Sequence, residues 1–570
     1  MSHDLHIRGG LVVDGTGAAG RRADVAVEDG RIVEVAERLD GTAERTIEAD
    51  GRIVCPGFVD LHTHYDIQAF WDPTLSPSPL HGVTTAIAGN CGFSVAPMAS
   101  SEADYLMQML ARVEGMPLDS LAAATDWGWD SFASYLARID GTIGPNLGFL
   151  AGHSAIRRVT MGEAANERAA TDDEISAMRR LLGECLDAGA LGFSSSWAPT
   201  HLDGDGTPVP SRFAEDVELL ELCDEVRRHT SSALEFIPGL GDFTEAEAEL
   251  MGRMSATADR PLNWNVLVVM AGIAERVAGQ LAASDRAAEL GGRVLGLTIP
   301  TTVRPRLSFM SGFLLDTIPG WQRPMTESHA AKVARLSSPE ARRELLATAG
   351  DARLGLANFG QYVLTECTSP GTQQYEGRTV AEVASELGVE PFDALCDIAL
   401  DNDLRTGFSF PPYGDTEDDW RARVEVWRDP RSIIGASDAG AHLDFLATFN
   451  YPTVLLQRAV VDLGLLSWEE AIALMTDAPA RLYGLVDRGR LVEGACADVV
   501  VIDPGRVGPE PVVSRIDLPA GGWRLYGGAT GIDHVLVNGV EVVTDGVIGD
   551  ARPGTVLRAG RDTVAVSAAP

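Results

Sequence analysis

The chain is poor in positive charge and almost without lysine. Its 570 residues include 46 Lys and Arg against 82 Asp and Glu, which gives a formal net charge of −36, and Lys332 is the only lysine. Nucleic acids and anionic lipids are bound through basic patches that displace counterions, so this balance argues against either partner. A small molecule is the class of substrate that the composition favours.

Long apolar runs and a cysteine framework are also missing. No stretch of about 18 apolar residues occurs, and the start, MSHDLHIRGGLVVDG, lacks a positively charged leader followed by an apolar core. The seven cysteines are an odd number without framework spacing, as expected where thiols stay reduced. The sequence therefore predicts a soluble, cytoplasmic protein that is not inserted in a membrane.

The apolar content of 45% is enough for one large core and a smaller satellite domain. Residues 1–55 have the pattern of short alternating strands broken by turns, and the same pattern returns after about residue 488. We therefore expect residues 1–55 and 488–570 to pair in one small β-sandwich domain.

Between the two ends, short apolar runs alternate with helical stretches, the pattern of βα units around a parallel sheet. Eight such runs predict an α/β fold with a TIM-like (β/α)8 barrel over residues 56–487. Residues 97–145 and 303–430 are too long for simple connections and are expected to be insertions that cover the active-site face. The eight candidate strands are Gly57–His64, Val83–Cys91, Leu147–His153, Ala190–Ser196, Ala233–Pro238, Leu262–Val269, Val294–Pro300 and Ile433–His442.

The most informative local segment is PGFVDLHTHYD, where an apolar strand ends in His-x-His. Alternation along a strand places His62 and His64 on the same face, so both imidazoles can reach one metal ion. Strands also carry such pairs by chance or as exposed polar residues. The pair alone therefore indicates a metal site without establishing one.

Two other strand ends carry groups with metal or acid–base chemistry. Cys91 lies in GNCG, where a thiolate is a strong zinc ligand and glycines permit close approach, although a buried free cysteine is the ordinary alternative. Asp438 lies in IIGASDAGAHLD, where a carboxylate can act as general base and then acid, or can merely cap a helix. His442 in the same segment is either substrate-binding or structural.

Taken together, these segments resemble the amidohydrolase superfamily over nearly the whole chain. Their order, from GGLVVDGTG through PGFVDLHTHYD and SDAGAH to GACADVVVID, is that of most members. GNCG and GHSAIRRVTMG are similar to the N-acyl-D-amino-acid deacylase branch. The resemblance implies that His62, His64 and Cys91 bind metal and that Asp438 is the catalytic base.

The chain departs from that resemblance at three places. Related deacylases carry histidine ligands on the fifth and sixth strands, where this sequence has Glu235 and Asn265. Carboxylate can replace imidazole on an ion, whereas an amide oxygen is a weaker ligand, so Glu235 is a candidate ligand and the second metal position is open. Many relatives also use a carboxylated lysine, which we do not expect because Lys332 lies in an insertion. The cofactor is expected to be zinc or a similar divalent transition metal, as one or two ions.

Four further residues are candidates for contact with substrate. His153 in GHSAIRRVTMG could polarise the scissile carbonyl, bind a carboxylate, or be a satisfied strand-end histidine. The loop after the fourth strand carries His201, Asp203, Asp205 and Arg212, and it could contact substrate, bind calcium or cap the barrel. His201 is also a potential metal ligand, and Arg212 is a fork suited to a substrate carboxylate. His442 is the fourth candidate.

The sequence thus predicts an enzyme that hydrolyses a non-peptide amide, such as an N-acyl (D-)amino acid or a related carboxylate-bearing amide. Water activated at the metal would be deprotonated by Asp438. The same scaffold could instead cleave a lactone, an ester or a carbon–carbon bond of a 1,3-dicarbonyl. A non-catalytic, hydantoinase-like scaffold protein is a third interpretation, which retention of His62, His64 and Asp438 disfavours. Whether the chain forms a homo-oligomer is left open.

Overall fold

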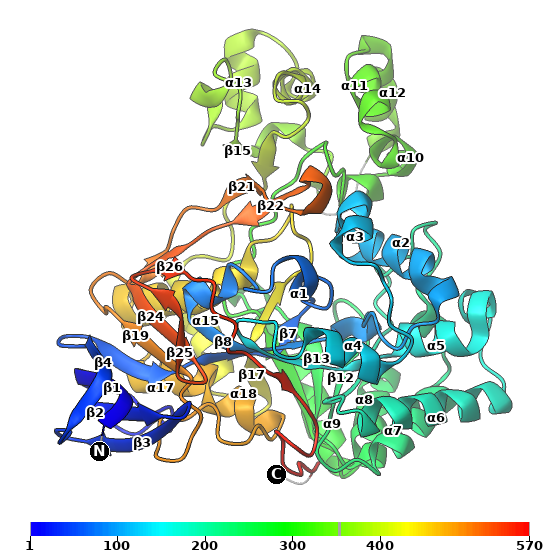
Figure 1. Ribbon diagram of the computed structural model, residues 1–570. Coiled ribbons are helices and arrows are strands. Elements are labelled where there is room, and N and C mark those ends of the chain that lie inside the picture. The colour runs from blue at the N-terminus through cyan, green and yellow to red at the C-terminus, as the bar shows by residue number, and fades with distance from the viewer. Residues whose placement is uncertain (1, 351–354, 569–570) are drawn as a thin grey trace.

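Both ends of the chain contribute strands to one sheet in the computed structural model, which describes residues 2–350 and 355–568 (Figure 1). The two ends meet where β5 (Ile53–Pro56) pairs antiparallel with β19 (Val499–Ile502). Both strands are continuous apolar runs, mostly valine and isoleucine, and all of their residues are buried, as expected for strands covered on both faces. The other strands, in sheet order, are β26 (Val547–Ile548), β25 (Val540–Thr544) and β24 (Ile532–Val537) beyond β19, then β1 (Ser2–Val12), β2 (Arg21–Glu28) and β3 (Arg31–Ala36) beyond β5, with β4 (Thr42–Glu48) beside β1.

The end of the chain leaves this sheet. β27 (Val556–Leu557) pairs in parallel with β9 (Asn146–Phe149) in the central part of the molecule. Two short ribbons also depart from the sheet, formed by β20 (Gly508–Pro509) with β23 (Ala529–Thr530) and by β21 (Val513–Ile516) with β22 (Trp523–Tyr526). Residues 488–570 therefore do more than complete the terminal sheet, because they also pack against the central part.

The central part is built from parallel strands that alternate with helices, an α/β arrangement. Each of the eight segments predicted as strands contains at least one strand of this set. Parallel pairing runs in the orders β6–β8–β9–β27, β10–β11–β12–β13–β14–β17 and β18–β7. The strands are β6 (Phe58–Asp60), β7 (His62–Thr63), β8 (Val83–Ala88), β10 (Ala151–Gly152), β11 (Gly192–Ser196), β12 (Ala233–Ile237), β13 (Leu262–Leu267), β14 (Val294–Thr298), β17 (Ser432–Ile434) and β18 (Ala436–Ala439).

Several of the helices outside these strands begin at capping residues that are visible in the sequence. α6 (Asp172–Asp187) begins after Thr171, whose hydroxyl accepts from Glu174 N while the Glu174 carboxylate accepts from Thr171 N, a capping box. The helix then buries Ile175, Met178 and Leu182 at helical spacing. The other helices near these strands are α1 (Gln68–Trp71), α5 (His153–Met161), α7 (Asp216–Val226), α8 (Glu245–Ala258), α9 (Ala274–Glu289), α16 (Tyr451–Leu455), α17 (Trp468–Met475) and α18 (Asp477–Leu482).

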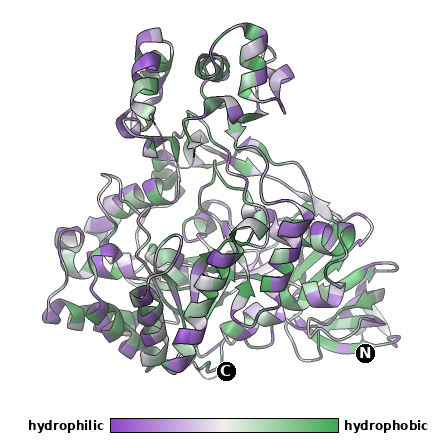
Figure 2. Ribbon diagram, turned by 180° about the vertical axis from the view of Figure 1, so that it is seen from behind, coloured by the Kyte–Doolittle hydropathy of each residue, from purple (hydrophilic) through white to green (hydrophobic). Residues whose placement is uncertain are grey.

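The two long insertions form separate helical segments. Residues 97–145 contain α2 (Ala103–Val113), α3 (Leu118–Ala124) and α4 (Phe132–Ile139). Residues 303–430 have a hydrophobic core of their own, and its helices α10 to α14 project from the body of the molecule (Figure 1). These helices carry hydrophilic as well as hydrophobic residues along their length (Figure 2). The elements of this insertion are α10 (Gln322–Thr326), α11 (His329–Leu336), α12 (Pro339–Ala349), β15 (Val363–Glu366), α13 (Val380–Leu387), α14 (Pro391–Asp401), β16 (Gly407–Ser409) and α15 (Glu417–Trp427).

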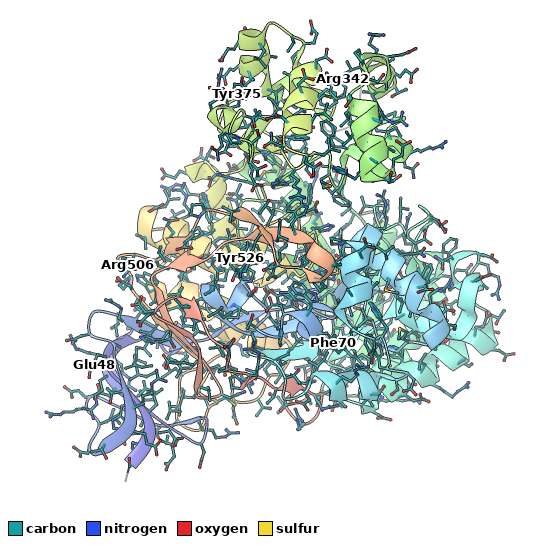
Figure 3. The ribbon with its side chains drawn as sticks, turned by 45° about the horizontal axis from the view of Figure 1, so that its top comes forward. Glu48, Phe70, Arg342, Tyr375, Arg506 and Tyr526 are labelled. Carbon is teal, nitrogen blue, oxygen red and sulfur yellow. The ribbon has the colours of Figure 1, made fainter. Side chains whose placement is uncertain are left out.

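Aromatic packing and ion pairs hold the projecting insertion together. The ring of Phe359 lies 5.4 Å from that of Trp321 and 4.6 Å from that of Phe392, measured between centroids. Arg342 on α12, labelled in Figure 3, pairs with two aspartates of α14 at 3.0 and 2.6 Å. None of the helices within the described ranges has the length and apolar character that crossing a bilayer requires.

Candidate metal centre

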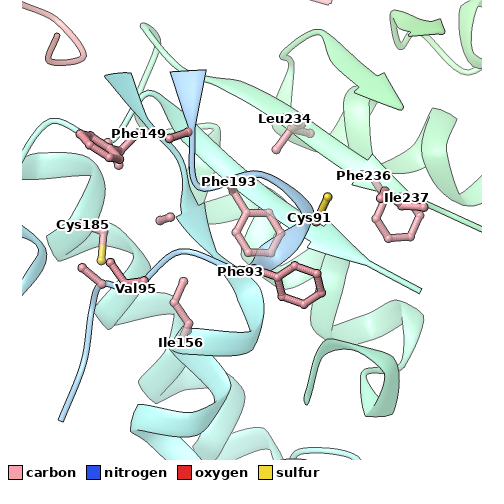
Figure 4. Close-up of a cluster of buried hydrophobic side chains, with 14 of the residues drawn as sticks. Cys91, Phe93, Val95, Phe149, Ile156, Cys185, Phe193, Leu234, Phe236 and Ile237 are labelled. Atoms are coloured by element: carbon pink, nitrogen blue, oxygen red, sulfur yellow. The ribbon is translucent and has the colours of Figure 1, made fainter. Parts of the chain in front are cut away.

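Three side chains with metal-binding atoms converge where β7 and the loop after β8 meet. His62, His64 and Cys91 are all buried, and their ligand atoms lie within 4.8 Å of one another. Cys91 Sγ is 3.4 Å from His62 Nε2 and 3.8 Å from His64 Nε2. Cys91 packs beside Phe93 and Phe193 in an otherwise hydrophobic layer (Figure 4).

The loop that carries Cys91 is fixed by its neighbours in GNCG. Gly89 has φ of 77°, and a Cβ there would lie 2.3 Å from the carbonyl oxygen of Leu150, so only glycine fits without a shift. The side chain of Asn90 donates to the carbonyls of Thr63 at 3.1 Å and Ile87 at 2.9 Å. The bond to Thr63 attaches the loop to the segment that carries both histidines, and the bond to Ile87 holds it against the end of β8.

The donor set fits a zinc-like ion. Zinc–sulfur and zinc–nitrogen bonds of about 2.3 and 2.0 Å, placed at tetrahedral angles, separate the two ligand atoms by about 3.5 Å. The observed separations of 3.4 and 3.8 Å agree with that geometry. Two imidazoles and a thiol are also the donors that favour such an ion over magnesium or calcium.

Asp438, at the end of β18, faces the cluster of His62, His64 and Cys91. Its Oδ1 is 3.2 Å from His64 Nε2 and 3.6 Å from His62 Nε2, and its Oδ2 is 3.9 Å from His442 Nε2. Burial opposes its ionisation, but the hydrogen bond and charge of His64, together with the nearby histidines, hold its pKa below the usual range. Asp438 is therefore a charged carboxylate at neutral pH.

The charges around the two histidines differ. Burial lowers the pKa of His64, but the carboxylates of Glu114 and Asp438 outweigh burial and raise that pKa to about 9. Burial and the neighbouring charge of His64 lower the pKa of His62 to about 3. In the metal-free protein His64 holds the proton of the pair, so binding of an ion must displace that proton.

Glu114 was not predicted from the sequence. It follows α2 in the first insertion, is 2% exposed, and places Oε1 3.3 Å from His64 Nδ1. Its backbone carbonyl accepts from the backbone N of His442 at 2.5 Å. A lone acid after an inserted helix has no local pattern that marks it, so only the fold reveals its contact with His64.

Glu235 contacts the backbone of Cys91, and its carboxylate oxygens are not among the three clustered ligand atoms. Its carboxylate accepts from the backbone N of Cys91 at 2.9 Å and from the side-chain amide of Asn265. Burial raises the pKa of Glu235 to about 8. The two residues found where histidines were expected therefore bond to each other.

A cavity of about 360 Å³ opens over this cluster. His62, His64, Cys91, Glu114 and Asp438 contribute to its wall. The rest of the wall is mostly apolar, and it includes Ile237, Leu240, Val266, Val268, Val269, Met270, Ile299, Val303 and Leu446. Such a cavity has the size and lining of a small-molecule site.

Residues 45–543 match the profile of the Amidohydrolase family. The chain belongs to the amidohydrolase family. A D-aminoacylase of Alcaligenes xylosoxydans xylosoxydans is 29% identical over 97% of this chain and 97% of its own length. A protein of Mycobacterium bovis is 31% identical over 88% of this chain and 85% of its own. The solved N-acyl-D-glutamate deacylase of Bordetella bronchiseptica, complexed with zinc and a phosphonate inhibitor, is 27% identical, with a TM-score of 0.65 over 98% of this chain and 100% of that one. The predicted resemblance to the deacylase branch, and with it the prediction of a metal-dependent hydrolase, is confirmed.

Two of the histidines predicted to contact substrate line the cavity of this amidohydrolase. His201 and His442 both contribute to its wall. The Nδ1 of His201 lies 2.7 Å from Ser196 Oγ, and its ring is 4.9 Å from that of Phe93. Burial lowers the pKa of His201 to about 3, so the ring is neutral at physiological pH.

His153 and Arg212 are not among the residues that line the cavity. Both ring nitrogens of His153 are used, by Ser195 Oγ at 2.8 Å and by a carboxylate oxygen of Glu218 at 2.7 Å. Arg212 donates to the backbone carbonyls of Pro199 and His201 at 3.3 Å. In this structure His153 joins α5 to β11 and α7, whereas Arg212 supports its own loop.

The carboxylate of Asp203 accepts hydrogen bonds from the backbone of the same loop. Asp203 Oδ1 accepts from the backbone N of Thr207 at 3.0 Å and from that of Asp205 at 3.1 Å. Its other oxygen contacts Tyr105 OH at 3.3 Å, which joins the loop to the first insertion. These bonds fold the turn that presents His201 to the cavity.

Proposed function

We propose that this amidohydrolase hydrolyses the amide bond of an N-acyl amino acid or a related carboxylate-bearing amide, using one divalent transition-metal ion. The observation that carries the proposal is the convergence of His62, His64 and Cys91 beside Asp438 in the wall of one cavity. Activity toward N-acyl-D-amino acids in the named relatives supports the substrate class.

The chain's own residues supply binding and proton transfer. When bound, a divalent ion provides Lewis acidity toward water and toward a carbonyl oxygen. Asp438, charged at neutral pH, accepts a proton from the attacking water and returns it to the leaving nitrogen. Glu114 accepts from His64 Nδ1, which leaves Nε2 free to bind the ion.

The pairing of Glu235 with Asn265 supports one ion over two. The side-chain amide of Asn265 donates to the carboxylate of Glu235, and this carboxylate also accepts from the backbone N of Cys91. Glu235 does not join the cluster of three ligand atoms among the described residues. A second ion would have to displace these bonds, so we propose a single zinc-like ion without a carboxylated lysine.

We also propose that the parallel strands close into a TIM-like (β/α)8 barrel, with a β-sandwich domain built from both chain ends. A single residue separates β6 from β7, β9 from β10 and β17 from β18, so each pair continues one path of the chain. Joined through these continuations, the three pairing orders form a ring of eight. The seven cysteines are free thiols, which supports a cytoplasmic location.

The test is a substrate panel run on protein loaded with zinc, cobalt or manganese. N-Acyl-D- and N-acyl-L-amino acids are compared with lactones, esters and 1,3-dicarbonyls, and release of free amine or acid is measured. We expect amide hydrolysis that a chelator abolishes and added metal restores. Turnover of the lactones or dicarbonyls alone, or activity indifferent to chelation, would refute the proposal.

A further inference from the structure

The wall of the active-site cavity contains one arginine, Arg423, for which no salt bridge is found among the described residues. Arg423 on α15 is 4% exposed and is the only Arg or Lys among the described residues that line the cavity. Its Nη2 donates to the carbonyl of Gly414 at 2.5 Å, and its guanidinium carbon lies 4.8 Å from the Trp420 ring centroid. Its Nη1 is buried without a hydrogen-bond partner.

The two nearby acids, Asp419 and Asp415, are bonded to other groups. Asp419 accepts from the backbone N of Ala271 at 2.9 Å and caps its own helix through Thr416. Asp415 pairs with Arg304 at 2.6 Å and accepts from the indole N–H of Trp420 at 2.8 Å. Within residues 2–350 and 355–568, no carboxylate oxygen lies within 4.0 Å of the Arg423 guanidinium.

A buried cation without a counter-charge is costly, and an anionic ligand would remove that cost. The free Nη1 carries two hydrogens, and Nη2 keeps one after bonding to Gly414, which is the donor arrangement that a carboxylate accepts as a fork. The wall of the cavity that Arg423 lines also carries apolar side chains such as Val268, Met270 and Val303. The site therefore offers one anion position in apolar surroundings.

We propose that Arg423 binds the substrate carboxylate and that the apolar wall receives the amino-acid side chain, so that N-acyl derivatives of apolar, monocarboxylic amino acids are preferred. This inference rests on the proposed function. A second carboxylate, as in an N-acylated glutamate or aspartate, meets no second Arg or Lys among the described lining residues and is disfavoured. Arg423, supplied by the second insertion, takes the role that the sequence suggested for Arg212.

The test measures binding separately from turnover. The parent is zinc-loaded Asp438→Asn, and calorimetry compares N-acetyl-leucine, in each enantiomer, with its neutral primary amide. We expect the better-bound enantiomer to favour the carboxylate over the amide by roughly 10- to 100-fold, the range for a hydrogen-bonded charged group. Arg423→Gln should abolish that preference, Arg423→Lys should restore part of it, and bound zinc should be unchanged in both.

Arg212→Gln is the matched control, because it removes an arginine that does not line the cavity and that donates to the backbone carbonyls of Pro199 and His201. It should keep the preference for the carboxylate. Equal affinity of the parent for acid and amide, a preference that survives Arg423→Gln, or its loss in Arg212→Gln would each overturn the assignment. If Arg423→Gln fails to fold, the comparison of acid with amide in zinc-loaded Asp438→Asn still tests the proposal.

Kinetics on the wild-type holoenzyme then separate the two proposals. N-Acetyl-leucine should have a higher kcat/KM than N-acetyl-glutamate, and Arg423→Gln should raise KM for the former by about 10-fold or more. If no N-acyl amino acid is hydrolysed while binding still depends on Arg423, the proposed reaction fails and the anion site stands. If hydrolysis occurs and glutamate is preferred, the reaction stands and the specificity is wrong.

Discussion

Replacing Glu114 by glutamine tests whether the first insertion contributes to metal binding. Glutamine keeps the size of the side chain and an oxygen that can accept from His64 Nδ1, 3.3 Å away, but it removes the charge. The contact is buried, with Glu114 only 2% exposed, so solvent screens it little. We expect a folded protein that binds zinc more weakly.

The expected loss of zinc affinity follows from the charge that Glu114 brings to its contact with His64. A hydrogen bond to a charged group contributes about 1.5–3 kcal/mol, and one between neutral groups about 0.5–1.5 kcal/mol. The difference of roughly 1.4 kcal/mol corresponds to about a tenfold weaker affinity, at the lower end of the effects known for residues that support metal-binding histidines.

The pH dependence of the loss distinguishes this mechanism from general damage. Glu114 helps to raise the pKa of His64 to about 9, so below that pH a proton competes with the ion in the wild type. The substitution lowers this pKa and weakens the competition. The affinity deficit should therefore be largest near pH 9 and smaller near pH 6.5.

The assay is competition between the protein and a chromogenic chelator for zinc across that pH range. Glu102→Gln is the control: Glu102 directly precedes α2 at its other end, about 18 Å from Glu114 along the helix, and pairs with Arg158 at 2.5 Å. It should bind zinc as the wild type does. Affinities of Glu114→Gln within twofold of wild type at every pH would show that the carboxylate does not support the metal ligand.

Three further outcomes are expected. His62→Ala should lose bound zinc in elemental analysis, whereas Asp438→Asn should keep zinc and lose about 10²- to 10⁴-fold in kcat; substantial activity in the latter would exclude a general base there. Arg157→Ala leaves the Glu218 carboxylate buried beside fewer partners and should lower the free energy of unfolding by about 3–5 kcal/mol without changing KM, as denaturant titration and kinetics can check. Because the pKa of folded His64 is raised to about 9 from an ordinary 6.5, its contribution to stability is complete below pH 6.5 and is lost as pH rises through 9. The melting temperature of metal-free protein should fall over that interval, and a fall of equal size in His64→Ala would contradict this.

The sequence alone determined those features that depend on local spacing. His62 and His64 share a face because alternation along a strand has a period of two, and the strand end places both at one point. The eight predicted strand segments all contain strands, because buried parallel strands are short apolar runs. Cys91 and Asp438 were identified by strand-end segments that resemble a family, and both lie at the cluster.

Only the tertiary structure decided which distant side chains share the site. Glu114 and Arg423 reach the cavity from the two insertions, more than 300 residues apart, and neither stands in a pattern that marks it. The sequence could not decide between His153 as a substrate contact and as a satisfied core residue, and the fold surrounds it with Ser195 and Glu218. The physical reason is common to these cases: a side chain's role depends on which partners folding brings within hydrogen-bonding distance, and periodicity along the chain carries no information about partners that are remote in sequence.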